Sequence, residues 1–256
     1  MITRENYTEY NSKTWDLWSE EGCEWSMPIS HEKYIEALNG RLDVYLTPCK
    51  PVPFGWFPPL KNKSVLGLAS GGGQQCPIFQ AHGANVTIFD ISEKQLEAER
   101  IVADREGYTI EIVRGDMTKR LPFENRCFDI IFHPVSNCYV QDVQHIWNEC
   151  FRVLRKGGVL LSGFSNPFVF VFKNMLTGEF GDKIVTKLPV DPLKDNTDEE
   201  LKQIMESDGI QFSHSLESLI GGQIKAGFRI VDLYEDYHNE GEQAAPGYIC
   251  TKAVKE

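Results

Sequence analysis

Three consecutive glycines, at positions 71–73, follow an apolar run that ends at Leu68, with two residues between. Glycine has no Cβ atom, so a ligand can lie against the main chain at such positions. In open α/β sheets, ligands bind outside the carboxyl ends of the strands, where a turn leads into a helix. A tight turn without a ligand is the alternative interpretation, but three glycines exceed what a turn requires. The turn is therefore a candidate ligand site.

An acidic residue lies at or near the end of each of the next two apolar runs. Asp90 lies near the end of the run 85–92, and Asp116 ends the run 108–116. A carboxylate at the end of a second strand can accept hydrogen bonds from both hydroxyls of a ribose. Asp116 could accept from an adenine amino group while Met117 faces the ring, or it could be a turn residue. Together these positions predict a nucleoside site.

The glycine turn makes little provision for phosphate. A phosphate-binding P-loop requires a Gly-Lys-Ser/Thr ending, which the sequence lacks, and the dinucleotide pattern G-x-G-x-x-G lacks its third glycine here. The residues therefore favour an adenosine joined to something other than phosphate, and S-adenosylmethionine fits that description. A nicotinamide-dependent oxidoreductase on a related sheet stays open as an alternative.

The hydrophobic periodicity around these residues alternates between strand and helix patterns. It predicts strands over 64–70, 85–92, 108–116, 127–135 and 159–165, and helices over 75–84, 92–107 and 143–158. A later helix over 213–228 leads into strands over 228–237 and 247–255, whose short connection indicates an antiparallel hairpin at the sheet edge. The expected fold class is α/β: a doubly wound, mostly parallel seven-stranded sheet with an antiparallel last strand, as in Rossmann-like folds.

Four segments differ in composition and suggest a division of the chain. Residues 1–60 are polar and aromatic, then rich in proline, and predict an N-terminal arm or lid. Residues 61–165 form the predicted ligand-binding core, and residues 213–256 complete its sheet. Residues 166–212 are polar and punctuated by proline, which indicates an insertion or cap.

Aromatic residues are concentrated in the arm. Trp15, Trp18 and Trp25 stand close to helical spacing, and such a stripe usually packs in a core. A lid over the ligand is the second interpretation. Farther along the arm, the segment 30–40 predicts a short helix that Ser30 caps and Gly40 ends.

Composition limits the classes of partner. The 256 residues carry a formal net charge of −11 without a cluster of Lys and Arg, which argues against nucleic acid and anionic lipid surfaces. The seven cysteines are scattered, odd in number and without a C-x-x-C pair, as expected for reduced thiols and not for a zinc site or a disulfide framework. The sequence shows no secretory signal or membrane span. We expect a cytoplasmic protein with no metal, nucleic acid or membrane partner.

The motifs in their order resemble the class I S-adenosylmethionine-dependent methyltransferases, in particular the small-molecule branch that includes the ubiquinone/menaquinone methyltransferases. The resemblance covers about residues 63–165, with weaker support from 213–254. VLGLASGGG corresponds to the first motif of the family, VTIFDIS to the second, GDMTKRLPFENRCFDIIF to the next, and NECFRVLRKGGVLL to the stretch before the fifth strand. Four motifs in the right order and at the right spacing make the resemblance specific.

The resemblance implies methyl transfer from S-adenosylmethionine to a small-molecule acceptor, with the acceptor, the type of nucleophile and the oligomeric state left open. His133 is a candidate general base, because imidazole titrates near neutrality; its alternative role is to shape the turn before Pro134. The implied cofactor-binding residues are Ala69, Ser70, Gly71, Gly73, Asp90, Ile91, Asp116, Met117 and His133.

The first motif departs from the family at two positions. Gly67 stands where the family usually has an acidic residue that helps to anchor the methionine portion of the cofactor, and Ala69 replaces the first glycine. Gln74, Gln75 or a group from the N-terminal arm could substitute for the acid. A protein that binds the cofactor without transferring a methyl group is the alternative function.

Overall fold

The computed structural model describes residues 1–174, 179, 181, 183–238 and 245–256, and these contain seven strands in one sheet. The first five strands are β1 (Ser64–Leu68), β2 (Asn85–Asp90), β3 (Glu111–Arg114), β4 (Phe128–His133) and β5 (Leu154–Ser165), and the last two are β6 (Phe228–Asp236) and β7 (Tyr248–Lys255). The strand order is β3-β2-β1-β4-β5-β7-β6. Strands β1 to β5 are parallel, whereas β7 runs antiparallel to both β5 and β6. The predicted fold class and edge hairpin are confirmed.

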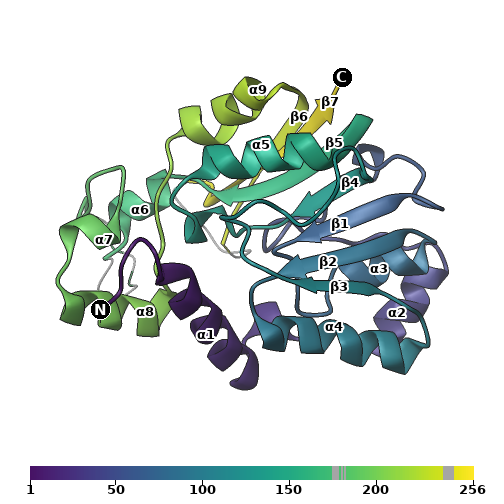
Figure 1. The fold of residues 1–256 in the computed structure, drawn as a ribbon, viewed down its shortest axis with the longest axis horizontal. Coiled ribbons are helices and arrows are strands. Elements are labelled where there is room, and N and C mark those ends of the chain that lie inside the picture. Colours follow the sequence, from purple (N-terminus) through teal and green to yellow (C-terminus); the bar gives the residue numbers. More distant parts are fainter. Residues whose placement is uncertain (175–178, 180, 182, 239–244) are drawn as a thin grey trace.

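Helices cover both faces of the sheet, because its strands are apolar on both sides (Figure 1). One face carries α2 (His31–Leu38), α3 (Cys76–Ala81) and α4 (Glu93–Glu106), and the other carries α5 (Val143–Val153) and α9 (Gly222–Ala226). Each face has its own apolar cluster, with Phe79 fully buried in one and Trp147 fully buried in the other. The sheet and its two helix layers form the frame on which the loops at the strand ends are held.

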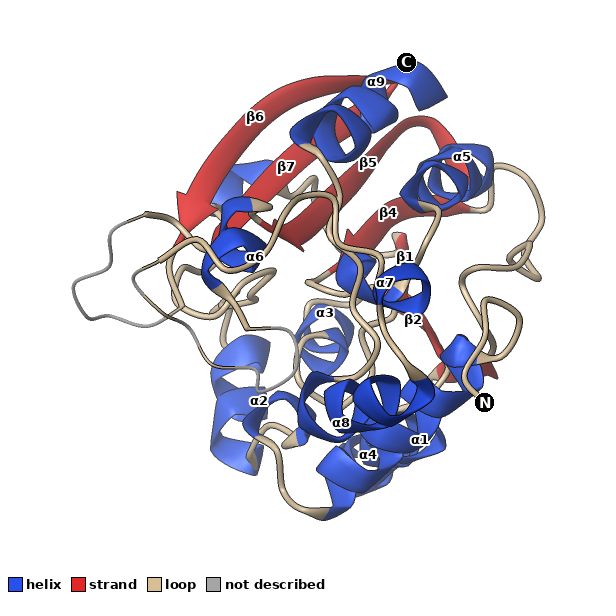
Figure 2. Ribbon diagram, turned by 90° about the vertical axis from the view of Figure 1, so that its left-hand side faces the viewer, coloured by secondary structure: helices blue, strands red, loops and turns tan. Residues whose placement is uncertain are grey.

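Two segments far apart in the sequence lie side by side beyond the strand ends (Figure 2). The N-terminal segment contains α1 (Tyr7–Glu20), and the segment after β5 contains α6 (Phe168–Phe172), α7 (Pro192–Asp195) and α8 (Asp198–Asp208). Tyr7 of α1, Ile204 of α8 and Phe212 are buried in one apolar cluster. None of the helices in the described residues is long and apolar enough to cross a bilayer.

Local signals fix several helix ends as predicted. The Ser92 hydroxyl accepts a hydrogen bond from the Gln95 N–H at 3.1 Å, and Gly107 ends α4 in the left-handed conformation at φ 72°. In the same way Ser30 caps α2, and Gly40 follows its end at φ 99°.

The prediction of a helix over 143–158 is wrong at its C-terminal end. Helix α5 stops at Val153, because Leu154 is extended (ψ 143°) and already pairs with Phe128 of β4. The next pair is Ile130 with Val159, so residues 155–158 bulge out of the ladder. The helix predicted over 213–228 also differs, since it begins with a π-helical turn at Glu217–Gly221.

Asp142 offers a direct test of capping in this fold. Its carboxylate accepts hydrogen bonds from the backbone N–H groups of Gln144 (3.0 Å) and His145 (3.3 Å) at the start of α5. We expect Asp142→Ala to lower the free energy of unfolding by about 1 kcal/mol in urea titrations. Asp104→Ala, which removes an exposed acid from α4, is the control and should change it by less than about 0.5 kcal/mol. Equal effects would contradict a capping role.

Candidate functional site

A cavity of about 1710 Å³ opens at the carboxyl ends of the parallel strands. Pockets for small molecules usually measure about 300–1,000 Å³, so this one has room for two small ligands. No group of three His, Cys, Asp or Glu residues suited to a metal ion occurs within the described ranges. Seven of the nine predicted cofactor-binding residues line the cavity, namely Ala69, Ser70, Gly71, Asp90, Ile91, Asp116 and Met117. Gly73 and the His133 side chain are not among the lining residues.

The Asp90 carboxylate lies at the end of β2 and is held by main-chain donors. Its two oxygens accept hydrogen bonds from the N–H groups of Gly71 and Ser92, each at 3.0 Å. None of the described Lys, Arg or His side chains forms an ion pair with it. Burial raises the pKa of Asp90, while these N–H donors act in the opposite direction. Because a carboxylate can accept about four hydrogen bonds, Asp90 keeps acceptor capacity for two hydroxyls of a ligand in the cavity.

The turn after β1 keeps a glycine-type conformation despite its alanine. Ala69 has φ 47°, in the left-handed region that residues other than glycine rarely adopt. Its N–H donates to the Phe89 carbonyl of β2 at 2.7 Å, which fixes the start of the turn. The backbone at position 69 therefore keeps the left-handed conformation that suits glycine, although the residue is alanine.

Helix α4 packs directly on the three glycines. A Cβ atom on Gly71 would lie 2.7 Å from the Gln95 Cβ, and one on Gly73 would lie 2.9 Å from the Ala98 carbonyl oxygen and from Val102. These distances are too short for any side chain. The glycines are thus required for the packing of α4 on the turn, a reason that the sequence alone did not provide.

The Cys76 sulfur atom fills the space into which a side chain at position 67 would extend. A Cβ atom on Gly67 would lie 2.5 Å from the Cys76 Sγ, so an acidic side chain would require the buried Cys76 side chain to move. The two glutamines suggested as substitutes have other partners. The Gln74 side-chain NH₂ group donates to the main-chain carbonyls of Glu24 and Met27. The Gln75 side-chain oxygen accepts from the Tyr45 N–H. A different carboxyl group lies under the turn, that of Glu99 on α4, whose Oε1 accepts from the Gly73 N–H at 2.8 Å.

Three polar side chains of α1 face the loops of the sheet. Thr8, Ser12 and Asp16 are four residues apart, which places them on one side of the helix. The Thr8 hydroxyl donates to Asp116 at 2.9 Å, and the Ser12 hydroxyl donates to the Ile91 carbonyl at 3.0 Å. The N-terminal segment is thereby attached to two of the predicted cofactor-binding residues.

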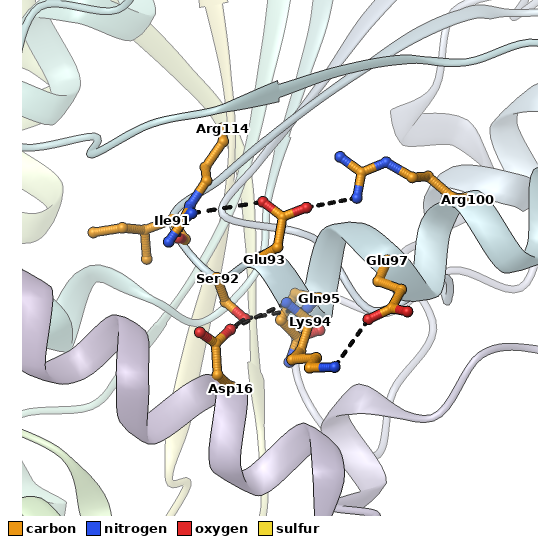
Figure 3. Close-up of polar contacts among 9 residues, drawn as sticks. All are labelled: Asp16, Ile91, Ser92, Glu93, Lys94, Gln95, Glu97, Arg100 and Arg114. Atoms are coloured by element: carbon orange, nitrogen blue, oxygen red, sulfur yellow. Dashed lines mark hydrogen bonds and ion pairs between the residues drawn. The ribbon is translucent and has the colours of Figure 1, made fainter.

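Asp16 completes this row of contacts at the start of α4 (Figure 3). Its carboxylate accepts from the Ser92 hydroxyl at 2.6 Å and from the Lys94 N–H at 3.1 Å. An acid at this place also interacts favourably with the positive end of the α4 dipole. Sequence reasoning missed these contacts, although the four-residue spacing was a usable signal.

The tryptophans of the arm do not form a core stripe, and that expectation is wrong. Trp15 and Trp18 are half-buried, line the cavity and meet edge to face with ring centres 5.1 Å apart. Trp15 also meets Tyr139 edge to face at 5.7 Å. Trp25 is 47% exposed at the cavity rim. The rings form part of the cavity wall, where amphipathic side chains suit a ligand with both apolar and polar parts.

His133 is fully buried at the end of β4 and joins the ends of two strands. Its Nδ1 lies 2.9 Å from the Leu68 carbonyl oxygen and must carry a proton to donate there. Its Nε2 lies 3.0 Å from the side-chain amide of Asn137. Burial lowers the pKa of His133, so the ring is neutral. With its proton on Nδ1, the ring accepts a hydrogen bond at Nε2. The Asn137 side chain is therefore assigned the orientation in which its NH₂ group faces Nε2. This geometry favours the structural alternative for His133, because the ring does not reach the cavity.

A second set of polar side chains lines the cavity. Lys173 is buried and forms an ion pair with Asp208 at 2.8 Å. The Tyr248 hydroxyl, at the start of β7, lies 2.9 Å from the His238 Nδ1. Burial and the Lys173 charge lower the pKa of His238. This part of the cavity therefore combines a Lys–Asp ion pair, an imidazole that is neutral near pH 7 and a phenol.

The attachment of α1 to α4 can be tested by removing its acid. Asp16→Ala leaves the Ser92 hydroxyl and the Lys94 N–H without their acceptor, so the amides of α1 should exchange with deuterium faster than in the parent protein. We expect an increase of roughly fivefold or more, because one such contact contributes about 1 kcal/mol. Glu9→Ala is the control, since Glu9 pairs with Lys13 on the same helix. Unchanged exchange in Asp16→Ala would show that α1 is held in another way.

Comparison with known proteins places the chain among enzymes. The family model described as "Methyltransferase domain" matches residues 66–162, from β1 to β5. A crystal structure of an S-adenosylmethionine-dependent methyltransferase from Mesorhizobium loti superposes with a TM-score of 0.61 at 20% identity, covering 78% of this chain and 94% of that one. This likeness shows the fold.

Sequence relatives extend the comparison beyond the fold. The ubiquinone/menaquinone biosynthesis C-methyltransferase UbiE of Cereibacter sphaeroides is 32% identical over 128 residues, 47% of this chain and 51% of that protein, which confirms the resemblance expected from the motifs. The uncharacterized methyltransferase YbaJ of Bacillus subtilis is 43% identical over 248 residues, 96% of this chain and 97% of the relative. With this degree of identity over nearly its whole length, the chain belongs to the methyltransferase family.

Proposed function

We propose that the protein transfers a methyl group from S-adenosylmethionine to a small-molecule acceptor in the cytoplasm. The observation that carries the proposal is the Asp90 carboxylate, which faces the cavity, has no cationic partner among the described side chains and is oriented by two main-chain N–H groups. This arrangement suits the two hydroxyls of a ribose.

The other predicted residues fit the rest of the cofactor. Asp116 and Met117 follow β3 and line the cavity beside Asp90, where they suit an adenine ring. The bare main chain at Gly71, together with Ala69 and Ser70, suits the methionine portion. Gly73 would act through the shape of the turn, since it packs on α4, and His133 would act by fixing the ends of β1 and β4.

The bound cofactor would supply a methyl group activated by the sulfonium. The residues of the chain would then position the acceptor in line with that group and exclude water, because displacement at such a centre depends mainly on orientation. Trp15, Trp18 and Tyr139 supply an aromatic wall for this purpose. The hydrogen bonds of Thr8 and Ser12 attach α1 beside the cavity, and the arm would act as a lid if they open for ligand exchange.

The proposed acceptor site is the end of the cavity that contains Lys173, Tyr139 and Tyr248. Residues of the N-terminal segment and of the segment after β5 line it together, and an enclosure of this kind suits a small molecule. The net charge of −11 also disfavours nucleic acid and anionic membranes. Lys173 with the pair His238–Tyr248 supplies the polar contacts that such an acceptor needs.

Isothermal titration with S-adenosylhomocysteine and S-adenosylmethionine tests the cofactor site. Asp90→Ala should weaken binding by roughly a hundredfold, since each hydrogen bond to a charged group contributes about 1.5–3 kcal/mol. Asp90→Asn should weaken it less but clearly, because an amide has one acceptor oxygen instead of two and its NH₂ group would meet the N–H of Gly71 or Ser92. Asp104→Ala is the control and should bind like the parent protein. If neither cofactor form binds the parent protein at millimolar concentration, the proposal fails.

A turnover assay distinguishes methyl transfer from cofactor binding without transfer. The protein is incubated with methyl-labelled S-adenosylmethionine and a deproteinised cytosolic extract, and label is sought in small molecules. We expect labelled products, and Asp90→Ala should reduce their formation at least tenfold. Tight cofactor binding with no labelled product would favour the alternative of a binding protein without methyl transfer.

A further inference from the structure

The three glycine amides after β1 each have a defined acceptor. The Gly71 N–H donates to Asp90 at 3.0 Å, the Gly72 N–H to the Gln95 carbonyl at 2.9 Å, and the Gly73 N–H to Glu99 at 2.8 Å. Glycine restricts its own backbone least of all residues, so these acceptors select the conformation of the turn. Two of the three belong to α4, and one of those is an ionisable side chain.

Glu99 is fully buried beneath the turn. Its Oε1 accepts from Gly73, whereas its Oε2 has no hydrogen-bond partner in the part of the chain that the structure describes. The ionisable groups around it are the Cys76 thiol of α3, the Asp90 carboxylate of β2 and the Tyr108 hydroxyl after α4. Each of these is neutral or negative, and none of the Lys, Arg and His side chains that the structure describes contributes to the pKa of Glu99. The surroundings therefore oppose a negative charge on Glu99.

We propose that the neutral carboxyl group of Glu99 holds the glycine turn in the conformation that binds the cofactor, and that ionisation of this group releases the turn. This inference rests on the proposed function, because the ligand of the turn is taken to be S-adenosylmethionine. Glu99 is a positioning residue: it touches Gly73 and acts on the ligand through Gly71 and Asp90.

Burial supports this assignment, because it raises the pKa of Glu99 to about 8. A folded-state pKa above the unfolded value near 4.5 means that the stabilising contribution is complete below about pH 4.5 and is lost as the pH rises through 8. An ionised Glu99 would put an unpaired charge beside Asp90 in a dry environment. The Gly73 N–H donor favours the charged form, but the cost of burying the charge is larger, so above pH 8 we expect the turn to open and ligand binding to weaken.

The experiment measures the dissociation constant of S-adenosylhomocysteine by titration from pH 6.5 to pH 9. Glu99→Gln is the central variant, since its amide has the shape of the neutral carboxyl group and cannot ionise. The dissociation constant of the parent protein is divided by that of Glu99→Gln at each pH. This ratio cancels the effect of the ligand's own amine, whose titration affects both proteins equally. We expect a ratio near one at pH 7, rising by up to about tenfold at pH 9.

Two further variants complete the series. Glu99→Leu removes the acceptor of the Gly73 N–H and should weaken binding about tenfold or more at every pH. Glu97→Gln, which removes an exposed acid from the outer side of α4, is the matched control and should follow the parent protein throughout. A binding ratio for Glu99→Gln that does not change with pH would overturn the proposal, even if Glu99→Leu fails to fold.

An independent measurement distinguishes this inference from the proposed function. The infrared difference spectrum between the parent protein and Glu99→Gln at pH 7 should contain the carbonyl band of a protonated carboxyl group, and the thermal stability of Glu99→Gln should fall less steeply than that of the parent protein from pH 6 to pH 9. Absence of both features would refute the neutral carboxyl group. If they are present while the parent protein binds no cofactor, the proposed function fails and the state of Glu99 is nevertheless established.

Discussion

The close contact between α4 and the turn after β1 is the constraint on which the site depends. The helix lies so near to residues 71–73 that only glycine fits, and it supplies acceptors for two of their three amides. The remaining amide is bound by Asp90, which also orients the first turn of α4 through Ser92. A strand end, a turn and a helix start are thus joined by one short network. The ligand-binding surface is the outer side of that network.

The same helix start connects the core to the N-terminal segment. Ser92 caps α4 and also donates to Asp16 of α1, so the capping residue takes part in two contacts at once. Thr8 and Ser12 continue the row toward the loops after β3 and β2. The strand ends therefore form the floor of the cavity, and α1 is attached beside them by partly buried hydrogen bonds.

Local motifs could be predicted from the sequence, and long-range contacts could not. Asp90 and Asp116 follow apolar runs of strand length, and parallel strands bring their ends to one edge, so their shared location was predictable. Thr8 is 108 residues from Asp116, and no local pattern indicates that these two side chains meet. The burial of Glu99 could be predicted in part, since residues 95, 99 and 102 lie on one face of α4 and this face is buried. The end of α5 was misjudged because Leu154 continues the apolar pattern of the helix while it pairs with β4.

The apolar cluster shared by α1 and α8 has a kinetic consequence. Tyr7, Ile204 and Phe212 are buried against one another, so lifting the arm alone would expose these rings and branched chains to water. Movement of the arm together with the segment after β5 would keep this contact, whereas movement of the arm alone would break it. Opening by the joint movement would expose both ends of the cavity at once.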